Sequence, residues 1–412
     1  MNRVSVFPAA LAGSVAAPLS KSYAHRMLIA AALSGGSLSF GDSDDAYRTA
    51  KGLCEMGFEA TFDGNTVRYG AFRPSSEVRN VHVGESGSTL RFLLPLAAAL
   101  GVSANFVTEG RLGERPMEGL AAALRAHGVT TDGKSVSGSL TAGRFEIDAT
   151  VSSQYVTGLL MALPLLNGDS EIVLRGRMVS APYVDITTEV LRKAGVIVTR
   201  MEEGFLVRGG QRYAMREDRV PGDHSGAAFF LVAGALGAGV TVTGLDLASA
   251  QGDKAVVDLL EKAGAEVTRE KGAVTVRRKA LRAFTADLGG IPDLAPILSV
   301  LAAYADGESI FRQVGRLRDK ESDRLSAIRR MLSQAGVTTR EEGDDLYIVG
   351  GRPHGGVFDS YSDHRMCMSA AVLAAFAEGE SVITDKDCVK KSYPAFWEDF
   401  ARVGGKYEVE RG

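Results

Sequence analysis

The stretch AVVDLLEKAGAEV (residues 255–267) joins a helix with charge on one side, a glycine at its end and the start of an extended segment. The same ending, an apolar residue followed by three residues and a glycine, recurs six times. The copies are Leu53 to Gly57, Leu124 to Gly128, Leu191 to Gly195, Leu260 to Gly264, Leu332 to Gly336 and Phe400 to Gly404. Successive glycines lie roughly 70 residues apart, and this even spacing predicts a sixfold repeat.

Each repeat contains a strongly apolar helix, a strand, an amphipathic helix that ends at the repeat glycine, and further strands, which is a βαβαββ unit. The apolar helices are expected over residues 27–33, 92–100, 155–166, 227–236, 294–305 and 366–377. Because they are apolar nearly all round, they should be buried. The pattern predicts an α/β (α+β) fold with inner helices, surrounding sheets and outer helices.

The composition is that of a globular protein with more than one core. A chain of 412 residues with 45% hydrophobic content exceeds what one core usually supports, so two domains are expected. The net charge of −3 argues against a broad nucleic-acid or anionic-membrane surface. Three cysteines without paired spacing favour neither a disulfide framework nor a zinc site, and we expect a cytoplasmic protein.

Two uncharged stretches could be mistaken for a secretion signal or a membrane span. Pro8 and Gly13 interrupt the first, residues 4–17. Glycines divide the second, residues 226–244, which is better explained as a buried helix, a turn and a strand.

Polar residues stand where the apolar helices begin, about 40 residues before each repeat glycine. They are Lys21, Gly87, Ser153, Asp223, Asp293 and Asp363. A second layer, about 12 residues before the glycines, is expected at the starts of the second helices. It consists of Arg115, Tyr183, Arg324 and Lys391.

Cations are concentrated at or near these helix starts, although the helix dipole disfavours positive charge there. They are Lys21, Arg26, Arg91, Arg115, Lys320, Arg324, Arg365 and Lys391. Any one of them is more easily explained as a solvated surface charge, and Ser20, Ser86, Ser152 and Ser362 as simple helix caps. Together, at matched offsets, they predict a substrate that carries phosphates and carboxylates.

Two acids in these layers are candidates for general acid and base chemistry. Asp293 follows Pro292 at a helix start, and Glu321 lies between Lys320 and Arg324. The plainer alternatives are an N-cap for Asp293 and a first-turn helix acid for Glu321.

Ten short motifs, in order along the chain, resemble those of the 5-enolpyruvylshikimate-3-phosphate (EPSP) synthases. They are LSKSYAHR (19–26), SGSTLR (86–91), ERPM (114–117), SSQY (152–155), SAPYVD (180–185), GDHS (222–225), IPD (291–293), KESDR (320–324), DHRM (363–366) and KSYP (391–394). The resemblance covers essentially the whole chain. It implies transfer of the enolpyruvyl group of phosphoenolpyruvate to the 5-hydroxyl of shikimate 3-phosphate, in aromatic amino acid biosynthesis.

The resemblance also implies a two-domain inside-out α/β barrel with three repeat units in each domain. Residues 20–221 would form an inserted domain, and 1–19 plus 222–412 a discontinuous one completed by the N-terminal strand. The active site is expected in the cleft between them, open without ligand. Phosphoenolpyruvate and shikimate 3-phosphate are the expected partners of a monomer, with no metal, organic cofactor, nucleic acid or membrane.

By the same resemblance, each candidate site residue has a role. Shikimate 3-phosphate would contact Lys21, Ser22, Arg26, Ser152, Ser153, Gln154, Ser180, Tyr183, Asp293 and Lys320. Phosphoenolpyruvate would contact Lys21, Gly87, Arg115, Gln154, Arg324, Arg365 and Lys391. Asp293 would accept the proton of the 5-hydroxyl, and Glu321 would donate one to the methylene carbon. Lys21 would assist either transfer.

The chain departs from the family pattern at three positions. Glu85 and Arg316 stand where asparagine is common, and Ser88 stands where threonine is usual. A carboxylate beside a phosphoenolpyruvate loop is unfavourable, so we expect Glu85 to turn away from the ligand or to pair with a cation.

Two other functions remain alternatives at this point. A related enolpyruvyl transferase acts on a UDP-linked N-acetylglucosamine, but it commonly has a cysteine in the second repeat's loop, where this chain has none. A non-enzymatic repeat protein that binds polyanions would need a broad basic face and stacking aromatics. A test for phosphate release distinguishes an enzyme from such a protein.

Overall fold

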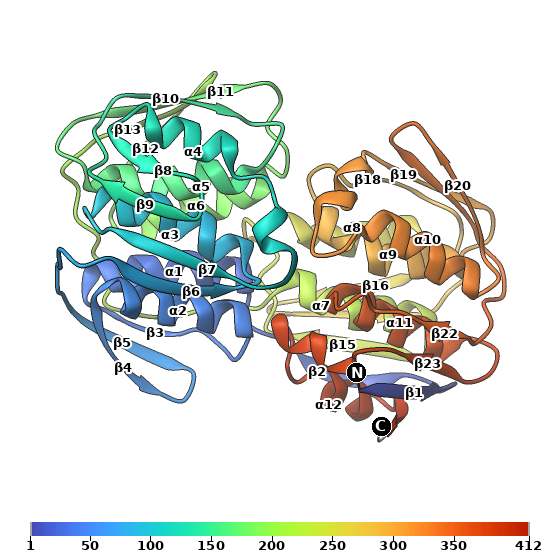
Figure 1. The fold of residues 1–412 in the computed structure, drawn as a ribbon. Helices are drawn as coiled ribbons and strands as arrows, with labels where there is room; N and C mark the ends of the chain where they lie inside the picture. Colours follow the sequence, from blue (N-terminus) through green and yellow to red (C-terminus); the bar gives the residue numbers. More distant parts are fainter. Residues whose placement is uncertain (1, 411–412) are drawn as a thin grey trace. The chain divides into compact units, whose positions relative to one another are not determined.

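The computed structural model describes residues 2–410, and the chain divides into two compact units (Figure 1). The inserted unit is Lys21–Val220, and the discontinuous unit is Met1–Ser20 with Pro221–Gly412. Each unit has its own buried core and is described separately below.

The repeat predicted from the sequence is present as six sheets of four strands each. In one of them β6 (Arg79–Gly84) runs parallel to β7 (Ala104–Thr108), whereas β9 (Ser135–Gly138) is antiparallel to both β7 and β8 (Val129–Thr131). A helix follows each of the first two strands, which gives the order β6-α3-β7-α4-β8-β9. The predicted βαβαββ unit is therefore confirmed.

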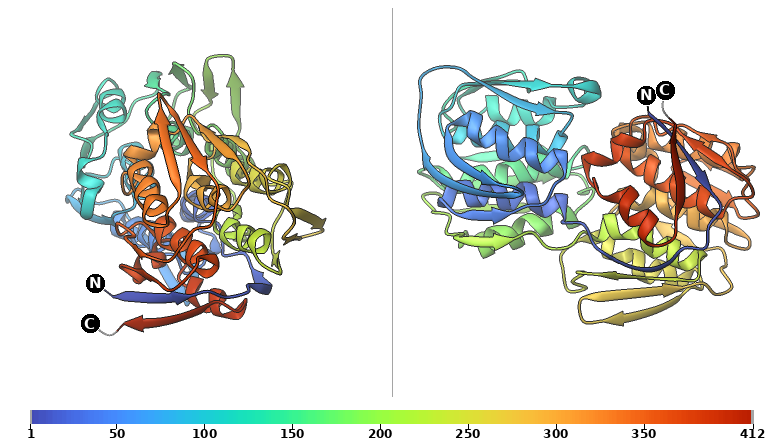
Figure 2. Two further views of the ribbon diagram at one scale, coloured as in Figure 1. Left: turned by 90° about the vertical axis from the view of Figure 1, so that its right-hand side faces the viewer. Right: turned by 90° about the horizontal axis from the view of Figure 1, so that it is seen from below.

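The inserted unit contains helices α1 to α6. Three are inner helices and three are outer helices, and their arrangement can be followed in Figures 1 and 2. The inner helices are α1 (Lys21–Ser34), α3 (Gly87–Ala99) and α5 (Ser153–Ala162), and most of their residues are buried. The outer helices are α2 (Asp44–Met56), α4 (Glu118–Arg125) and α6 (Pro182–Lys193). A second sheet contains β3 (Ser37–Ser39), β4 (Phe58–Asp63), β5 (Thr66–Phe72) and β14 (Glu217–Arg219). A third sheet contains β10 (Arg144–Asp148), β11 (Ser170–Arg175), β12 (Val198–Met201) and β13 (Gly204–Val207).

The discontinuous unit repeats this plan. Its inner helices are α7 (His224–Leu236), α9 (Ala295–Ala303) and α11 (His364–Phe376), and its outer helices are α8 (Val256–Lys262), α10 (Arg324–Gln334) and α12 (Phe396–Arg402). One of its sheets contains β2 (Ala12–Ala16), β15 (Gly239–Thr243), β16 (Glu266–Glu270) and β17 (Ala273–Arg277). Another contains β18 (Thr285–Asp287), β19 (Glu308–Arg312), β20 (Thr338–Glu342) and β21 (Asp345–Val349). The third contains β1 (Arg3–Phe7), β22 (Val357–Phe358), β23 (Ser381–Ile383) and β24 (Lys406–Glu410).

Strands distant in sequence complete the sheets at the two chain crossings. The sequence predicts one N-terminal strand in the discontinuous unit, but the structure has two, because Pro8 separates β1 from β2. β1 lies between β23 and β24, and β2 is parallel to β15. In the inserted unit the late strand β14 pairs with the early strand β3.

The repeat glycines end the outer helices in a left-handed conformation. Gly57 caps α2 with φ 119°, and its N–H bonds to the carbonyl of Cys54. The other five repeat glycines also have positive φ. Only glycine adopts this conformation without strain, which explains why it recurs at each helix end.

Candidate active site

The starts of α3 and α5 place a network of polar side chains in the inserted unit. The carbonyl oxygen of Gln154 accepts a hydrogen bond from Nη1 of Arg91 at 2.6 Å, and its amide donates to Ser88 at 2.9 Å. Arg115 comes close to Gly87, since a Cβ on that glycine would lie 2.7 Å from Nη1 of Arg115. Glycine thus leaves the arginine room beside the backbone.

Hydroxyl groups stand at the starts of α5 and α6 in this unit. Ser152 caps α5 by accepting from the N–H of Gln154, and Ser153 is the first residue of the helix. Ser180, two residues before α6, is buried and has φ 53°. This left-handed backbone is unfavourable for serine and occurs where the surrounding structure fixes it, often at a functional site.

Arg26 is 2% exposed and lies among protein partners rather than at a surface. Its Nε donates to the hydroxyl of Thr187 at 2.8 Å, and its terminal nitrogens donate to the carbonyls of Ser22 (2.6 Å) and Tyr183 (2.9 Å). The guanidinium also lies 5.0 Å from the centre of the Phe92 ring. Arg26 therefore fixes the backbone of two predicted substrate-contacting residues, Ser22 and Tyr183.

Lys21, the first residue of α1, is paired with an acid that the sequence did not single out. Its Nζ lies 2.8 Å from Oδ2 of Asp45, which is itself 8% exposed. Asp45 is in the first turn of α2, one residue after Asp44, and only the folded structure shows which acid faces the lysine.

In the discontinuous unit, Arg324 is fully buried and holds three carboxylates. Its Nε lies 2.7 Å from Oδ2 of Asp363, its Nη1 lies 2.8 Å from Oδ1 of Asp293, and its Nη2 lies 2.6 Å from Oε2 of Glu321. The predicted acid and base candidates are thus bound to the same guanidinium. Asp363 also caps α11 by accepting from the N–H of Arg365.

Further cations surround Asp293. Nη2 of Arg365 lies 2.9 Å from its Oδ2, and Nζ of Lys320 lies 3.8 Å from its Oδ1. Burial favours the neutral acid, but Arg365, Lys320 and Arg324 outweigh burial and lower the pKa of Asp293 well below its ordinary value. Burial in turn lowers the pKa of Lys320 to about 8, against the opposing effect of Asp293.

The second layer of predicted helix starts is correct for two of its four members. Tyr183 is in the first turn of α6, and Arg324 begins α10. The prediction is wrong for Arg115 and Lys391. Arg115 follows a 3-10 turn, Gly110–Glu114, and α4 begins only at Glu118. Lys391 is the last residue of another 3-10 turn, Lys386–Lys391, and α12 begins only at Phe396.

Proline explains both of these deviations. Arg115 precedes Pro116 and has the extended backbone that a following proline imposes, with ψ 144°. Pro394 lies three residues after Lys391 and, together with Ser392 and Tyr393, separates the 3-10 turn from the helix.

The caps predicted for the inner helices were partly correct. Ser86 and Ser152 cap α3 and α5. Asp363, not Ser362, caps α11, because Ser362 has a left-handed backbone with φ 52°. Asp293 lies on a 3-10 turn, Pro292–Leu294, and is not the N-cap of α9.

The three departures from the family pattern have distinct surroundings. The carboxylate of Glu85 lies against the backbone of Gly110, where an added Cβ would be 1.8 Å from Oε1. The hydroxyl of Ser88 accepts the Gln154 amide, so a serine supplies the acceptor there. Arg316 is near enough to Lys320 to lower the pKa of that lysine.

One buried acid was not singled out from the sequence. Asp253 is 6% exposed, and its Oδ1 is buried without a hydrogen-bond partner among residues 2–410. It is on a 3-10 turn, Gly252–Ala255, that lies at neither of the two repeat offsets. No offset or periodicity argument could have selected it.

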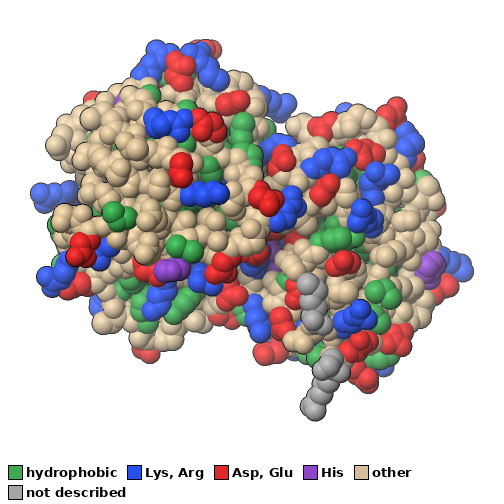
Figure 3. Space-filling view, viewed as in Figure 1, with side chains coloured by type: hydrophobic (Ala, Val, Ile, Leu, Met, Phe, Trp, Pro, Cys, Tyr) green, Lys and Arg blue, Asp and Glu red, His purple; other side chains and the backbone are tan. Residues whose placement is uncertain are grey.

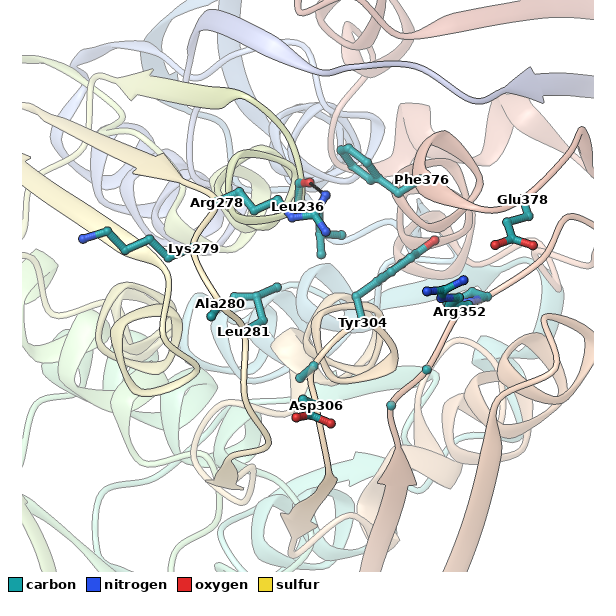
Figure 4. A pocket seen from close by; sticks show the side chains of 14 residues that line it. Leu236, Arg278, Lys279, Ala280, Leu281, Tyr304, Asp306, Arg352, Phe376 and Glu378 are labelled. Atoms are coloured by element: carbon teal, nitrogen blue, oxygen red, sulfur yellow. Dashed lines mark hydrogen bonds between the residues drawn. The ribbon is translucent and has the colours of Figure 1, made fainter.

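A cavity of about 590 Å³ lies at the opposite ends of the inner helices of the discontinuous unit (Figure 4). Leu236, Tyr304 and Phe376, at the C-terminal ends of α7, α9 and α11, line it. Arg278 reaches across to the carbonyl of Leu236 at 3.5 Å. None of the predicted site residues lines this cavity.

Three further observations concern the described residues. On the face drawn in Figure 3, basic and acidic side chains are interspersed rather than gathered by sign. Among residues 2–410, no group of three or more His, Cys, Asp or Glu could hold a metal ion. Within the same residues, no helix is long and apolar enough to cross a membrane.

Comparisons with known proteins agree with the ten motifs. A family model described as EPSP synthase (3-phosphoshikimate 1-carboxyvinyltransferase) matches residues 7–400. A relative from Clostridium kluyveri, named 3-phosphoshikimate 1-carboxyvinyltransferase, is 39% identical over 420 residues, covering 99% of each chain.

Solved structures confirm the predicted two-domain inside-out α/β fold. An EPSP synthase from Acinetobacter baumannii has a TM-score of 0.84 at 24% identity and is covered, like this chain, over 100% of its length. The enolpyruvyl transferase NikO from Streptomyces tendae has a TM-score of 0.80 at 19% identity, covering 100% of this chain and 99% of its own. These likenesses show the fold alone, whereas the family model and the full-length relative carry the assignment: the chain belongs to the EPSP synthase family.

Proposed function

We propose that the chain transfers the enolpyruvyl group of phosphoenolpyruvate to the 5-hydroxyl of shikimate 3-phosphate and releases phosphate. This reaction serves aromatic amino acid biosynthesis. The observation that carries the proposal is that Asp293 and Glu321 pair with the same buried guanidinium, that of Arg324. Such a pairing holds a base and an acid close together, as an addition followed by an elimination requires.

The inserted unit supplies the groups that bind shikimate 3-phosphate. Ser152, Ser153 and Ser180 bind its phosphate through hydroxyls and helix-start N–H groups. Lys21, Ser22, Arg26, Gln154 and Tyr183 contact or position the ring. The burial of Arg26 assigns it to positioning, since its nitrogens already donate to Ser22 and Tyr183.

Phosphoenolpyruvate binds to the cations. Gly87 and Arg115 of the inserted unit and Arg324, Arg365 and Lys391 of the discontinuous unit neutralise its carboxylate and phosphate. Fixed cations of this kind also stabilise the charge of a tetrahedral intermediate.

The pKa of Asp293 supports a role for the substrate in activating its own base. While Arg324, Arg365 and Lys320 surround Asp293, its lowered pKa makes it a weak proton acceptor. Phosphoenolpyruvate competes for those cations, and the pKa of Asp293 then rises, so that Asp293 becomes a better proton acceptor. The base therefore becomes effective when the second substrate is present.

The proton transfers then balance. The oxygen of the 5-hydroxyl forms a bond to the central carbon of phosphoenolpyruvate, its proton passes to Asp293, and Glu321 protonates the methylene carbon to a methyl group. In the elimination, phosphate leaves the same central carbon and takes up the proton held by Asp293, and the methyl group returns a proton to Glu321. Lys21 and Lys320 assist these transfers, and the pKa of Lys320 near 8 suits proton exchange close to neutral pH.

The test is phosphate release from phosphoenolpyruvate with shikimate 3-phosphate, compared with UDP-N-acetylglucosamine as the acceptor. We expect release with shikimate 3-phosphate only, and a decrease in kcat of roughly 10²- to 10⁴-fold in Asp293→Asn. Release with neither acceptor would refute the proposal, and release with the UDP-sugar alone would reassign the acceptor. A cytoplasmic monomer remains a prediction.

A further inference from the structure

The cavity of the discontinuous unit lies at the C-terminal ends of α7, α9 and α11, away from the helix starts of the proposed site (Figure 4). Its apolar wall consists of Leu236, Tyr304 and Phe376, each at or next to the end of one of these helices. With a volume of about 590 Å³, the cavity is within the size range of small-molecule sites.

Two aromatic rings of this wall are only half-buried. The rings of Tyr304 and Phe376 stand edge to face, with their centres 6.4 Å apart. The hydroxyl of Tyr304 donates to the carbonyl of Leu373 in α11 at 2.9 Å, so this phenol needs no polar partner from a ligand. What the two residues offer to a ligand is aromatic surface, which a third ring can contact edge to face or by offset stacking.

Leu281 and Pro353, which also line the cavity, occupy the same repeat position as a buried tyrosine of the inserted unit. The N–H of the residue that follows each of the three bonds to the alanine carbonyl just before a repeat glycine. The tyrosine is Tyr213, and its hydroxyl donates to the carbonyl of Met161, in the last turn of α5, at 2.6 Å. The inserted unit thus covers an inner-helix end with a ring of its own, whereas leucine and proline supply no ring to the cavity.

Charged side chains of both signs surround the apolar wall. Arg352, Asp306 and Glu378 line the cavity, and none of the three side chains has a hydrogen bond or ion pair within residues 2–410. The N–H of Glu378 donates to the carbonyl of Pro353 at 2.9 Å, which places this acid near Arg352. A guanidinium binds a carboxylate through two parallel N–H bonds, and a carboxylate attracts an ammonium group.

The helix ends argue against a simple anion as the ligand. The C-terminal end of a helix carries partial negative charge, and three helices end at this cavity. Together with Asp306 and Glu378 they repel a free phosphate, but they attract a ligand that also carries an ammonium group. A molecule with one carboxylate, one ammonium group and one ring matches the cation, the acids and the apolar wall at once.

We propose that this cavity binds an aromatic α-amino acid. Its ring lies against Tyr304 and Phe376, its carboxylate is held by Arg352, and its ammonium group faces Glu378 and the helix ends. Asp293 and Arg365 lie at the opposite ends of α9 and α11, so the amino acid and phosphoenolpyruvate can be bound at the same time. Binding changes no covalent bond, and the site goes beyond the proposed reaction without depending on it.

The test is calorimetric titration of the full chain with L-phenylalanine and with three analogues that each lack one of its groups. Hydrocinnamate lacks the ammonium group, phenethylamine lacks the carboxylate, and L-alanine lacks the ring. We expect L-phenylalanine to bind at one site per chain, and each analogue to bind at least about tenfold more weakly. No saturable binding of L-phenylalanine would overturn the proposal. Hydrocinnamate that binds as tightly as L-phenylalanine would also overturn it, because the ligand would then be a simple anion.

Two variants locate the binding in this cavity. Arg352→Gln and Glu378→Gln each remove one exposed charge, and each should weaken the binding of L-phenylalanine about tenfold. The matched control is Arg312→Gln, at an exposed arginine of β19 that does not line the cavity, and it should leave the affinity unchanged. Equal affinity in the wild type, Arg352→Gln and Glu378→Gln, or equal weakening in all three variants, would overturn the proposal.

A competition titration separates this cavity from the substrate site. The affinity for L-phenylalanine should be the same with and without phosphoenolpyruvate. Loss of binding in its presence would place the amino acid at the substrate site and overturn the proposal. Because these titrations need no turnover, a chain that releases no phosphate would refute the proposed function and leave the test of this cavity intact.

Discussion

Gly87 begins α3, and the side chains of two arginines lie beside it. A methyl group there would lie 2.7 Å from Nη1 of Arg115 and 3.0 Å from Nη1 of Arg91. Both atoms end flexible side chains, so we expect Gly87→Ala to fold and to displace the guanidinium groups. The predicted result is a KM for phosphoenolpyruvate raised about tenfold, equivalent to about 1.4 kcal/mol, in steady-state assays at saturating shikimate 3-phosphate.

The control for this prediction is Gly351→Ala, where an added methyl group meets nothing within 4 Å. It should leave the KM unchanged. An unchanged KM in Gly87→Ala would show that neither arginine acts on phosphoenolpyruvate from its position beside Gly87.

Arg324 illustrates a buried charge whose removal leaves several partners uncompensated. Arg324→Met deprives Asp293, Glu321 and Asp363 of their shared cation. Breaking one side of a buried ion pair destabilises a protein by about 3–5 kcal/mol, and we expect a loss of that order in urea unfolding, with loss of activity.

The comparison for Arg324→Met is Arg73→Met, which removes an exposed pair with Glu59. Its effect on unfolding should be close to undetectable, because exposed ion pairs contribute little. Equal effects of the two substitutions would contradict the role given to Arg324.

At the scale of the elements, a buried chain of hydrogen bonds links three helices of the inserted unit. Nδ1 of His25 in α1 lies 2.7 Å from the hydroxyl of Thr49 in α2, which lies 2.6 Å from that of Thr89 in α3. Thr89 in turn donates to Ser86, the cap of α3, at 2.8 Å. These hydrogen bonds connect the first turns of α1 and α3, which contain Lys21 and Gly87, through the same buried residues.

Burial lowers the pKa of His25 to about 3, with Asp45 opposing the shift. The folded protein therefore keeps His25 neutral, while the unfolded chain binds a proton below pH 6.5. His25 thus makes the free energy of unfolding fall as pH decreases from about 6.5 toward 3, by about 1.4 kcal/mol per pH unit. His25→Gln, which keeps a partner for Thr49, should reduce this slope in urea unfolding between about pH 7 and 5. Equal slopes in both proteins would refute the prediction.

The polar start that the sequence placed at Lys21 is confirmed, because α1 begins there. The apolar pattern itself covered only residues 27–33 of this helix. The first turn is polar and lacks apolar periodicity, yet Tyr23, His25 and Arg26 are buried, and each has a side-chain hydrogen-bond partner within the unit. Hydrophobic pattern alone cannot detect burial of this kind.

The motifs indicated most of the cations, but not their partners. Asp45, the partner of Lys21, lies outside the motif, in the second helix of the same repeat unit. No local pattern encodes this pair, because it forms only when α1 and α2 pack together. The helix starts predicted at Arg115 and Lys391 were wrong for a local reason, the prolines that follow.

At the scale of the whole molecule, the two units differ in how their sheets are completed. β14 lies within Lys21–Val220, so the inserted unit contains all the strands of its three sheets. Residues 221–412 lack β1 and β2, which belong to two sheets of the discontinuous unit. We predict that the fragment 21–220 unfolds cooperatively on heating, followed by circular dichroism.

The matched fragment 221–412 should not unfold cooperatively, because β23 and β24 would lose the strand between them. Joining residues 1–20 to it should restore the transition. Cooperative melting of 221–412 alone would show that β1 is dispensable for that core.

The position of β1 has a consequence for the order in which a growing chain can assemble. β1 is made early, but its neighbours β23 and β24 are made only near the end of translation. At 5–20 residues per second, β1 waits on the order of 20–80 s for both. The inserted unit is already complete when β14 leaves the ribosome, whereas the discontinuous unit closes last. A nascent chain thus exposes residues 3–7 without their strand partners through most of its synthesis. A chaperone that shields these residues would cover their unpaired backbone groups until β23 and β24 have been made.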